Sequence, residues 1–199
     1  MSTSKKLSVW PTNIHIHDNF LTDQAVVDEL RANAEIKDYF VTTEEKKALT
    51  PALQVLVDQT KFAVMNYCLE TGIDFDDLKM NNIQRNYIRS YNENTVGTYL
   101  YEPHDDVAEG GFITAVYYIN SDWREGGPWV GGELCLHNHL TFAYYHKNAI
   151  NVIPKPNRLI IFPGYKVHRV KPYFGKTPRA AATIGWTVER IPKEEPIII

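Results

Sequence analysis

"NRLIIFPGYKVHRVKPYFGKTPRAAATIGWTV", residues 157–188, decides the fold class of this 199-residue chain. Its Pro and Gly residues divide it into three short runs, 157–163, 166–173 and 179–188, which are rich in β-branched, aromatic or small apolar side chains. Runs of this length between turn residues are typical of β-strands. Short strands at this spacing favour an antiparallel sandwich or barrel over a parallel α/β sheet.

The same pattern continues upstream to about residue 81, and helices precede it. Strand-like runs occupy residues 83–91, 111–120 and 131–137. One helix is expected within residues 21–34, with Thr22 as its N-cap. A second is expected within residues 49–72, where Thr50 is the N-cap, Pro51 lies in the first turn and Gly72 ends the helix. The predicted fold is mainly β with N-terminal helices. Residues 1–80, a strand and helices, support a jelly-roll core of residues 81–199 within a single domain.

Composition narrows the cellular setting and the class of partner. Hydrophobic residues make up 44% of the chain, and the formal net charge of −3 gives no electrostatic reason to expect nucleic acid or an anionic membrane as the main partner. Cys68 and Cys135 each lie in an apolar run, as buried reduced thiols do. No signal peptide or membrane-spanning stretch is evident, so we expect a cytoplasmic protein. The oligomeric state is left open.

Histidine is scarce, and two of the seven histidines are the candidates for chemistry. Five are interpreted as structural residues of strands or turns: His15, His17, His137, His139 and His146. His104 and Asp106 form an H-x-D pair, whose side chains share one face of an extended segment while Asp105 points away. His168 enters a strand just after a Pro-Gly turn. Two histidines and one carboxylate are the facial triad of non-haem Fe(II) oxygenases, and the same set also binds Zn²⁺.

An arginine on an otherwise apolar strand is the second unusual feature. Arg179 begins the run "RAAATIGW", where a period of two places it on one face with Ala181 and Thr183. A guanidinium on an otherwise apolar strand is costly unless an anion pairs with it. The anion is either an Asp or Glu of the protein or a dicarboxylate cosubstrate held jointly by Arg179 and the metal.

Several blocks, in this order, resemble a known family: H-D-D, "FITAVYYINSDW", "GGELCLH", "NRLIIFPGYKVHRVKP" and "RAAATIGW". Residues 83–188 resemble the double-stranded β-helix core of Fe(II)/2-oxoglutarate-dependent dioxygenases, and among these the prolyl 4-hydroxylase branch with its oxygen-sensing members. The resemblance implies Fe²⁺, 2-oxoglutarate and O₂ as cofactor and cosubstrates, with ascorbate as a further candidate.

The resemblance also implies roles for individual residues. The iron ligands would be His104, Asp106 and His168. The distal carboxylate of 2-oxoglutarate would be bound by Arg179, with Tyr118, Tyr91 and Thr183 as further candidates on the cosubstrate. The exposed turn 174–178 is longer than in the oxygen-sensing members, so Lys176 competes with Arg179 for that carboxylate.

The implied reaction is hydroxylation of a C–H bond, with succinate and CO₂ as coproducts. The prolyl 4-hydroxylase resemblance implies a prolyl residue of a peptide or protein as substrate. A small metabolite or a nucleobase is an alternative substrate, and a non-catalytic jelly-roll module that holds a metal is an alternative function. Trp123, Arg124 and Trp129 in the Gly-rich stretch 121–132 are candidates for the rim of the substrate site; the alternative is a Gly-rich hairpin whose Trp residues pack against its base.

Overall fold

The computed structural model describes residues 14–34, 39–42, 49–88, 103–106, 112–137 and 149–189, with backbone alone for 39–42 and 84–88. Its elements form two antiparallel sheets and two helices, which confirms the predicted jelly-roll with N-terminal helices. The elements are β1 (His15–Asp18), α1 (Gln24–Ala32), β2 (Tyr39–Thr42), α2 (Pro51–Thr71), β3 (Asp77–Ile88), β4 (Phe112–Asn120), β5 (Leu134–His137), β6 (Ala149–Val152), β7 (Arg158–Pro163), β8 (His168–Val170) and β9 (Arg179–Glu189).

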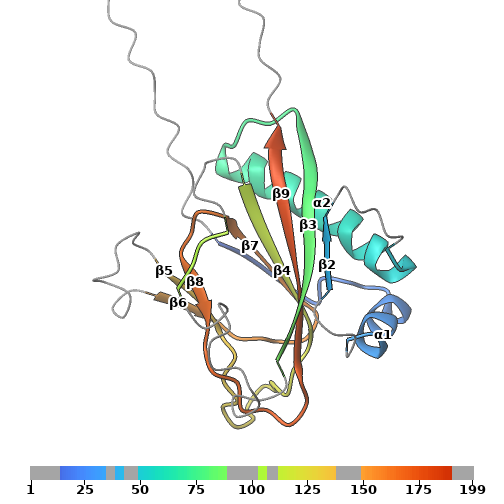
Figure 1. Ribbon diagram of the computed structural model, residues 1–199, viewed down its shortest axis with the longest axis vertical. Coiled ribbons are helices and arrows are strands. Elements are labelled where there is room, and N and C mark those ends of the chain that lie inside the picture. Colours follow the sequence, from blue (N-terminus) through green and yellow to red (C-terminus); the bar gives the residue numbers. More distant parts are fainter. Residues whose placement is uncertain are drawn as a thin grey trace, which may run out of the picture.

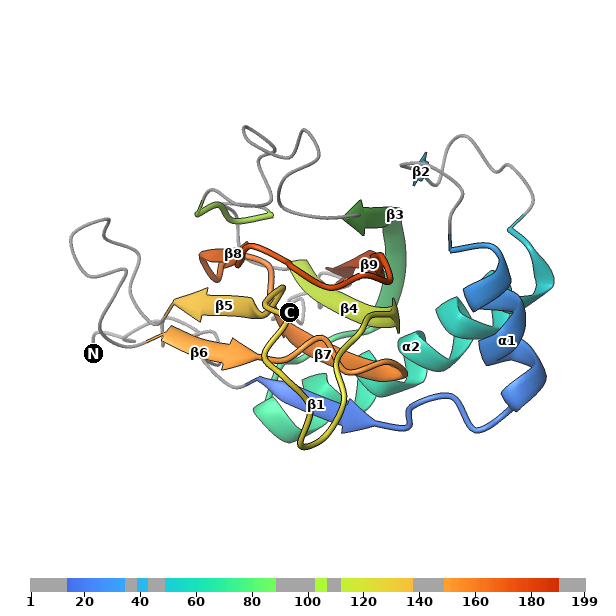
Figure 2. The same cartoon turned by 90° about the horizontal axis from the view of Figure 1, so that it is seen from below.

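The large sheet separates the helices from the small sheet. Its strand order is β1-β7-β4-β9-β3-β2, and the small sheet has the order β6-β5-β8. Figure 2 shows α1 and α2 on one side of the large sheet and β5, β6 and β8 on the other. Strands β4, β7 and β9 are therefore covered on both faces, which explains their nearly continuous apolar runs.

Alternation along the central strands sends neighbouring residues into two different cores. On β4, Tyr117 packs into the core beneath the helices, while Tyr118 packs into the core between the two sheets. On β9, Ala180 and Ala182 join the first core and Ala181 joins the second. The period of two thus marks the side chains that face the interior of the jelly-roll, the space between the sheets.

The helix ends follow the local sequence, with one correction. Thr50 caps α2, Pro51 opens it, and Gly72 ends it with φ of 72°, all as expected. In α1 the N-cap is Asp23 rather than the predicted Thr22, and its carboxylate accepts a hydrogen bond from Ala25 N at 2.9 Å. Both residue types are good N-caps, so the one-residue difference depends on where the backbone leaves the extended conformation.

The N-terminal part contributes strands as well as helices. The expected edge strand with His15 and His17 is β1, which pairs with β7. Strand β2 pairs with β3, and β6 pairs with β5; neither β2 nor β6 was expected. Strand β3 begins at Asp77, so it crosses the proposed division at residue 80, which stays a prediction.

Asn157 fastens the segment before α1 to the turn before β7. It adopts a positive φ of 59°. Its side chain accepts hydrogen bonds from Leu21 N at 2.9 Å and the Tyr117 hydroxyl at 3.1 Å, and donates one to Leu21 O at 2.9 Å.

Within the described residues, no helix combines the length and hydropathy needed to cross a membrane.

Candidate active site

His104, Asp106 and His168 converge at one end of the small sheet. One ligand atom from each lies within 4.8 Å of the others, and no other such group of three potential ligands occurs among the described residues. Asp106 Oδ1 lies 3.8 Å from His168 Nε2, and the two imidazole centroids are 4.4 Å apart. Asp105 between the two local members is exposed, as the alternation predicted. Two imidazoles and a carboxylate suit Fe(II) or Zn²⁺.

Backbone hydrogen bonds hold the H-x-D segment against β8. His104 N donates to His168 O at 2.9 Å, and His168 N donates to His104 O at 2.7 Å. Asp106 N donates to Gly164 O at 3.0 Å. His104 and His168 therefore form an isolated antiparallel β-bridge, although they lie far apart in the sequence.

The side-chain partners leave the metal-facing atoms available. His168 Nδ1 lies 2.9 Å from Lys166 O, so Nδ1–H donates and Nε2 keeps its lone pair. Burial lowers the pKa of His168 and the nearby Asp106 carboxylate opposes that effect, and the lowered pKa favours the neutral imidazole that metal binding requires. Thr114 Oγ1 donates to Asp106 Oδ2 at 2.5 Å and leaves Oδ1 toward His168.

Thr114 is a site residue that the sequence reasoning missed. It is fully buried on β4, and the period of two places it on the interior face with Val116 and Tyr118. The available signal was a hydroxyl within the apolar run 112–120 on the face that Tyr118 occupies.

Arg179 lies inside the jelly-roll with only 2% of its surface exposed. Its Nε donates to Gly132 O at 2.9 Å, and the guanidinium carbon lies 4.9 Å from the centroid of the Tyr118 ring. No Asp or Glu among the described residues pairs with it, so the alternative of a protein carboxylate is not found there. A buried guanidinium without a carboxylate is costly and fits the carboxylate of a ligand.

The Tyr118 hydroxyl points to the same kind of ligand. It is buried and makes no hydrogen bond of ordinary geometry among the described residues, although the Arg179 guanidinium and the Leu134 backbone lie near it. Burial raises the pKa of Tyr118, and the Arg179 cation only partly opposes this, so the hydroxyl keeps its proton and can donate. An unsatisfied donor beside a buried cation matches the needs of a carboxylate oxygen.

The other residues expected at the cosubstrate have different positions. Thr183 is half-buried on the face of β9 that carries Arg179, opposite Val116 of β4. Lys176 is exposed in the turn before β9, and this favours the buried Arg179 over Lys176 as the carboxylate-binding residue. Tyr91 lies outside the described residues.

The structure does not bring Trp123, Arg124 and Trp129 to the metal end. Strand β4 starts beside the H-x-D segment, because Gly164 N, next to Asp106, donates to Phe112 O. Its nine residues then run about 26 Å to the stretch 121–132. That stretch meets the turn between β8 and β9 at the lower end of the molecule in Figure 1. These residues therefore lie toward the end of the jelly-roll opposite the H-x-D segment, and their role at the substrate stays a prediction.

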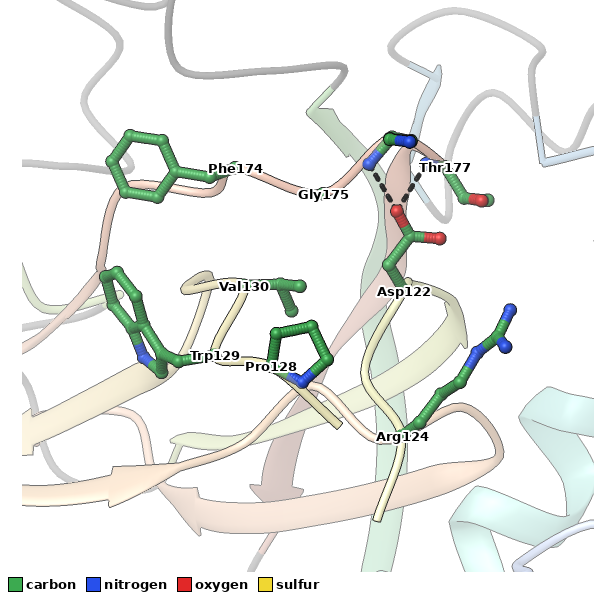
Figure 3. Close-up of a pocket in the computed structure, with 9 residues that line it drawn as sticks. Asp122, Arg124, Pro128, Trp129, Val130, Phe174, Gly175 and Thr177 are labelled. Carbon is green, nitrogen blue, oxygen red and sulfur yellow. Dashed lines mark hydrogen bonds between the residues drawn. The ribbon is translucent and has the colours of Figure 1, made fainter. Parts of the chain in front are cut away.

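At this far end the same stretch lines an open cleft of about 530 Å³. Trp129 and Phe174 face each other there with ring centroids 5.7 Å apart, and both are more than half exposed. Figure 3 shows Asp122 on the other side of the cleft from these two rings, reaching the backbone of the turn that carries Thr177. The cleft thus lies outside the metal site and next to the segment that leads into Arg179.

Taken together, the fold and the interior side chains define a double-stranded β-helix protein built to hold a divalent metal and a carboxylate ligand. A sequence model of the 2OG-Fe(II) oxygenase superfamily matches residues 88–187. The chain therefore belongs to the 2OG-Fe(II) oxygenase superfamily, whose members use Fe²⁺, 2-oxoglutarate and O₂. It is an oxygenase of this class, and the His-Asp-His cluster fits the metal.

Solved structures share the fold at low sequence identity. A Trichoplax adhaerens prolyl hydroxylase, in complex with a peptide of the hypoxia inducible factor oxygen degradation domain, is 17% identical with a TM-score of 0.59, covering 89% of this chain and 84% of its own. A Pseudomonas putida prolyl-4-hydroxylase is 16% identical with a TM-score of 0.62, covering 88% and 92%. AviO1 from Streptomyces viridochromogenes Tue57 is 12% identical with a TM-score of 0.65, covering 90% and 91%. No curated protein sequence matches the chain significantly.

Proposed function

We propose that this oxygenase hydroxylates a prolyl residue of a peptide or protein, with His104, Asp106 and His168 as its iron ligands. In this proposal Arg179 and Tyr118 bind the distal carboxylate of 2-oxoglutarate. The observation that carries it is the pairing of two sites on one interior surface. A set of three ligand atoms comes from β8 and the H-x-D segment, and a buried guanidinium with no carboxylate partner among the described residues lies beside a buried hydroxyl on β9 and β4.

Each side chain has a defined task in this proposal. Bound Fe(II) with 2-oxoglutarate and O₂ supplies the oxidising power, through oxidative decarboxylation of the cosubstrate to succinate and CO₂. Asp106 contributes the negative charge, and Thr114 holds that carboxylate in one rotamer. His168 offers Nε2 because its other nitrogen is bonded to Lys166 O. Arg179 and Tyr118 set the direction of the cosubstrate, so its reacting end faces the metal.

The interior wall near the two sites is apolar. It is formed by buried residues of both sheets: Val116, Leu134, Leu136, Ile160, Phe162 and Ala181. The small side chain of Ala181 lies two residues from Arg179 and leaves room for the carbon chain of the cosubstrate. A low-dielectric wall strengthens the guanidinium–carboxylate attraction and limits access of water to the reacting centre.

The choice of a prolyl substrate is supported by structural similarity to known enzymes. Two of the structural relatives are prolyl hydroxylases, and one of them is bound to a peptide. Thr183 and Tyr91 are proposed as further contacts of the cosubstrate.

The metal and cosubstrate roles are tested by anaerobic titration of the protein with Fe(II) and 2-oxoglutarate. A metal-to-ligand charge-transfer absorbance is expected for the wild type and should be lost in His104→Ala. His15→Ala removes a histidine from the edge strand β1 and serves as the matched control that retains the band. A protein that keeps a tightly bound zinc ion and shows no band would be the non-catalytic metal-binding module instead.

The substrate is tested separately by succinate release and mass spectrometry. Peptides that contain proline should stimulate succinate formation and gain 16 Da (roughly one oxygen atom), because hydroxylation inserts oxygen into a C–H bond. The same peptides with alanine in place of proline should do neither. Stimulation by oligonucleotides or by free metabolites alone would move the proposal to those substrates while leaving the reaction class in place.

A further inference from the structure

Among the described residues, Arg179 lies beside the Tyr118 side chain and has one contact with ordinary hydrogen-bond geometry. That contact is the hydrogen bond from Nε to Gly132 O at 2.9 Å, while the guanidinium carbon lies 4.9 Å from the Tyr118 ring centroid. Within the described ranges the terminal nitrogens donate no hydrogen bond of ordinary geometry, so they can meet a ligand. A carbonyl that bonds Nε fixes the plane of the guanidinium. The placement of the Gly132 carbonyl therefore sets the direction in which the two terminal nitrogens point.

Gly132 owes its placement to close packing on two neighbours. It adopts a φ of 75°, which favours glycine, and Gly132 N donates to Pro172 O at 3.0 Å. A Cβ at this position would lie 2.8 Å from Tyr173 Cδ2 and 3.0 Å from Arg179 Cδ. Gly132 is thus wedged between the tyrosine ring and the arginine side chain, and the position of that ring limits where the carbonyl can lie.

The hydroxyl of Tyr173 fixes its ring from the far end. Tyr173 is fully buried. Its hydroxyl donates to Thr177 O at 2.6 Å and accepts from Asp122 N at 2.8 Å. One side chain therefore joins the end of the β4 segment, the turn that leads into β9, and the glycine that bonds Arg179.

Asp122 completes this connection from the other side of the turn. Its Oδ2 accepts hydrogen bonds from Thr177 N at 2.7 Å and from Lys176 N (Figure 3). Burial raises the pKa of Asp122, but the hydrogen bonds from Thr177 and Lys176 outweigh burial and hold the pKa below its ordinary value. An ionised carboxylate with two backbone donors keeps the turn, and hence Thr177, in one conformation two residues before Arg179.

We propose that Tyr173 and Asp122 are positioning residues for cosubstrate binding, acting on Arg179 through Gly132 and the turn 173–177. This inference rests on the proposed role of Arg179 at the distal carboxylate. Neither residue touches the cosubstrate. These positioning roles would also explain three features of the sequence that the metal site does not explain: the aspartate of "NSDW", the Gly-Gly pair of "GGELCLH" and the turn "YFGKTP".

The test is a thermodynamic cycle on 2-oxoglutarate affinity. The dissociation constant is measured anaerobically on the Fe(II) protein for the wild type, Tyr173→Phe, Arg179→Gln and the double variant. Tyr173→Phe keeps the ring and deletes only the hydroxyl with its two hydrogen bonds. We expect the dissociation constant to rise about tenfold, roughly the effect of one net hydrogen bond on binding. In the Arg179→Gln background the same change should have little effect. At saturating 2-oxoglutarate kcat should stay near that of the wild type, so that the defect appears in KM.

A second ligand and a control variant separate positioning from general damage. 2-Oxobutanoate lacks the distal carboxylate, so its dissociation constant should be the same in Tyr173→Phe and the wild type. Tyr117→Phe deletes another buried hydroxyl, the one that bonds Asn157 on the helix side of the sheet, and should lower the melting temperature without changing 2-oxoglutarate affinity. Asp122→Asn weakens the same set of hydrogen bonds in the turn 173–177. If Tyr173→Phe fails to fold, the 2-oxoglutarate affinity of Asp122→Asn tests the positioning role instead.

The outcomes distinguish this inference from the function it rests on. If the wild type binds no 2-oxoglutarate, or Arg179→Gln binds it as well as the wild type, the proposed role of Arg179 fails. If Arg179→Gln weakens binding while Tyr173→Phe and Asp122→Asn do not, only the positioning role is overturned. Equal effects of Tyr173→Phe in both backgrounds, or an equal loss of 2-oxobutanoate binding, would also overturn it.

Discussion

Replacing Thr114 by valine should weaken metal binding while leaving the fold in place. Thr114 is fully buried, and its hydroxyl donates to Asp106 Oδ2 at 2.5 Å. Valine has nearly the same shape but no donor. A hydrogen bond to a charged group contributes about 1.5–3 kcal/mol, and each 1.4 kcal/mol corresponds to a factor of ten in affinity. If the whole free energy of this hydrogen bond is lost from metal binding, the metal dissociation constant should rise about 10- to 100-fold. Loss of other hydrogen-bond partners of metal ligands has effects of this size.

The assay is a titration of the apoprotein with Mn(II), followed by electron paramagnetic resonance of the free ion. Thr114→Ser keeps the hydroxyl and is the matched control, with an affinity expected near that of the wild type. A thermal melt of the apoprotein verifies that Thr114→Val is folded. A folded Thr114→Val protein that binds Mn(II) as tightly as the wild type would refute the argument that this hydroxyl orients Asp106.

Three further predictions concern stability, each measured by urea or thermal denaturation. Arg158 and Lys155 hold the pKa of Asp18 near 2, against an ordinary value of 3.8, so this carboxylate stabilises the fold above about pH 4 and the contribution is lost as the pH falls toward 2. Because the Asp18 side chain is 37% exposed, we expect Asp18→Asn to lower the free energy of unfolding by only about 1 kcal/mol at pH 7. The fall of that free energy between about pH 4 and pH 2 should become less steep, and an unchanged fall would contradict this. Asn157→Ala removes three hydrogen bonds at a positive φ and should cost about 2–4 kcal/mol, whereas a loss below about 1 kcal/mol would show that Leu21 and Tyr117 find other partners. Gly72→Ala should cost about 1 kcal/mol from backbone strain alone, because a Cβ there would meet nothing within 4 Å, and a neutral effect would refute the strain argument.

Local patterns were enough to predict most of the secondary structure. The second helix has its boundary signals beside it in the sequence, at Thr50, Pro51 and Gly72, and all three act as expected. The apolar runs became β3, β4, β5, β7, β8 and β9 for the same reason. Where two neighbouring residues carry the same signal, as Thr22 and Asp23 do, only the backbone conformation chooses between them. Strands β2 and β6 are short, and their pairing with distant strands is not visible in their own residues.

The sequence by itself determined which residues are candidates for chemistry. His104 and Asp106 share a face because a strand has a period of two, and Arg179 is conspicuous because burying a lone cation is costly. Both arguments concern a few neighbouring residues, so they need no three-dimensional knowledge.

Only the tertiary structure decided how these candidates are supported and which end of the jelly-roll each loop reaches. Thr114 meets Asp106, and Gly132 meets Arg179, through backbone pairings between segments far apart in the chain. The stretch 121–132 was expected at the substrate rim, and the direction of β4 places it toward the end of the jelly-roll opposite the H-x-D segment. Strand direction and register arise from non-local hydrogen bonds across the whole sheet, and no short stretch of sequence contains that information.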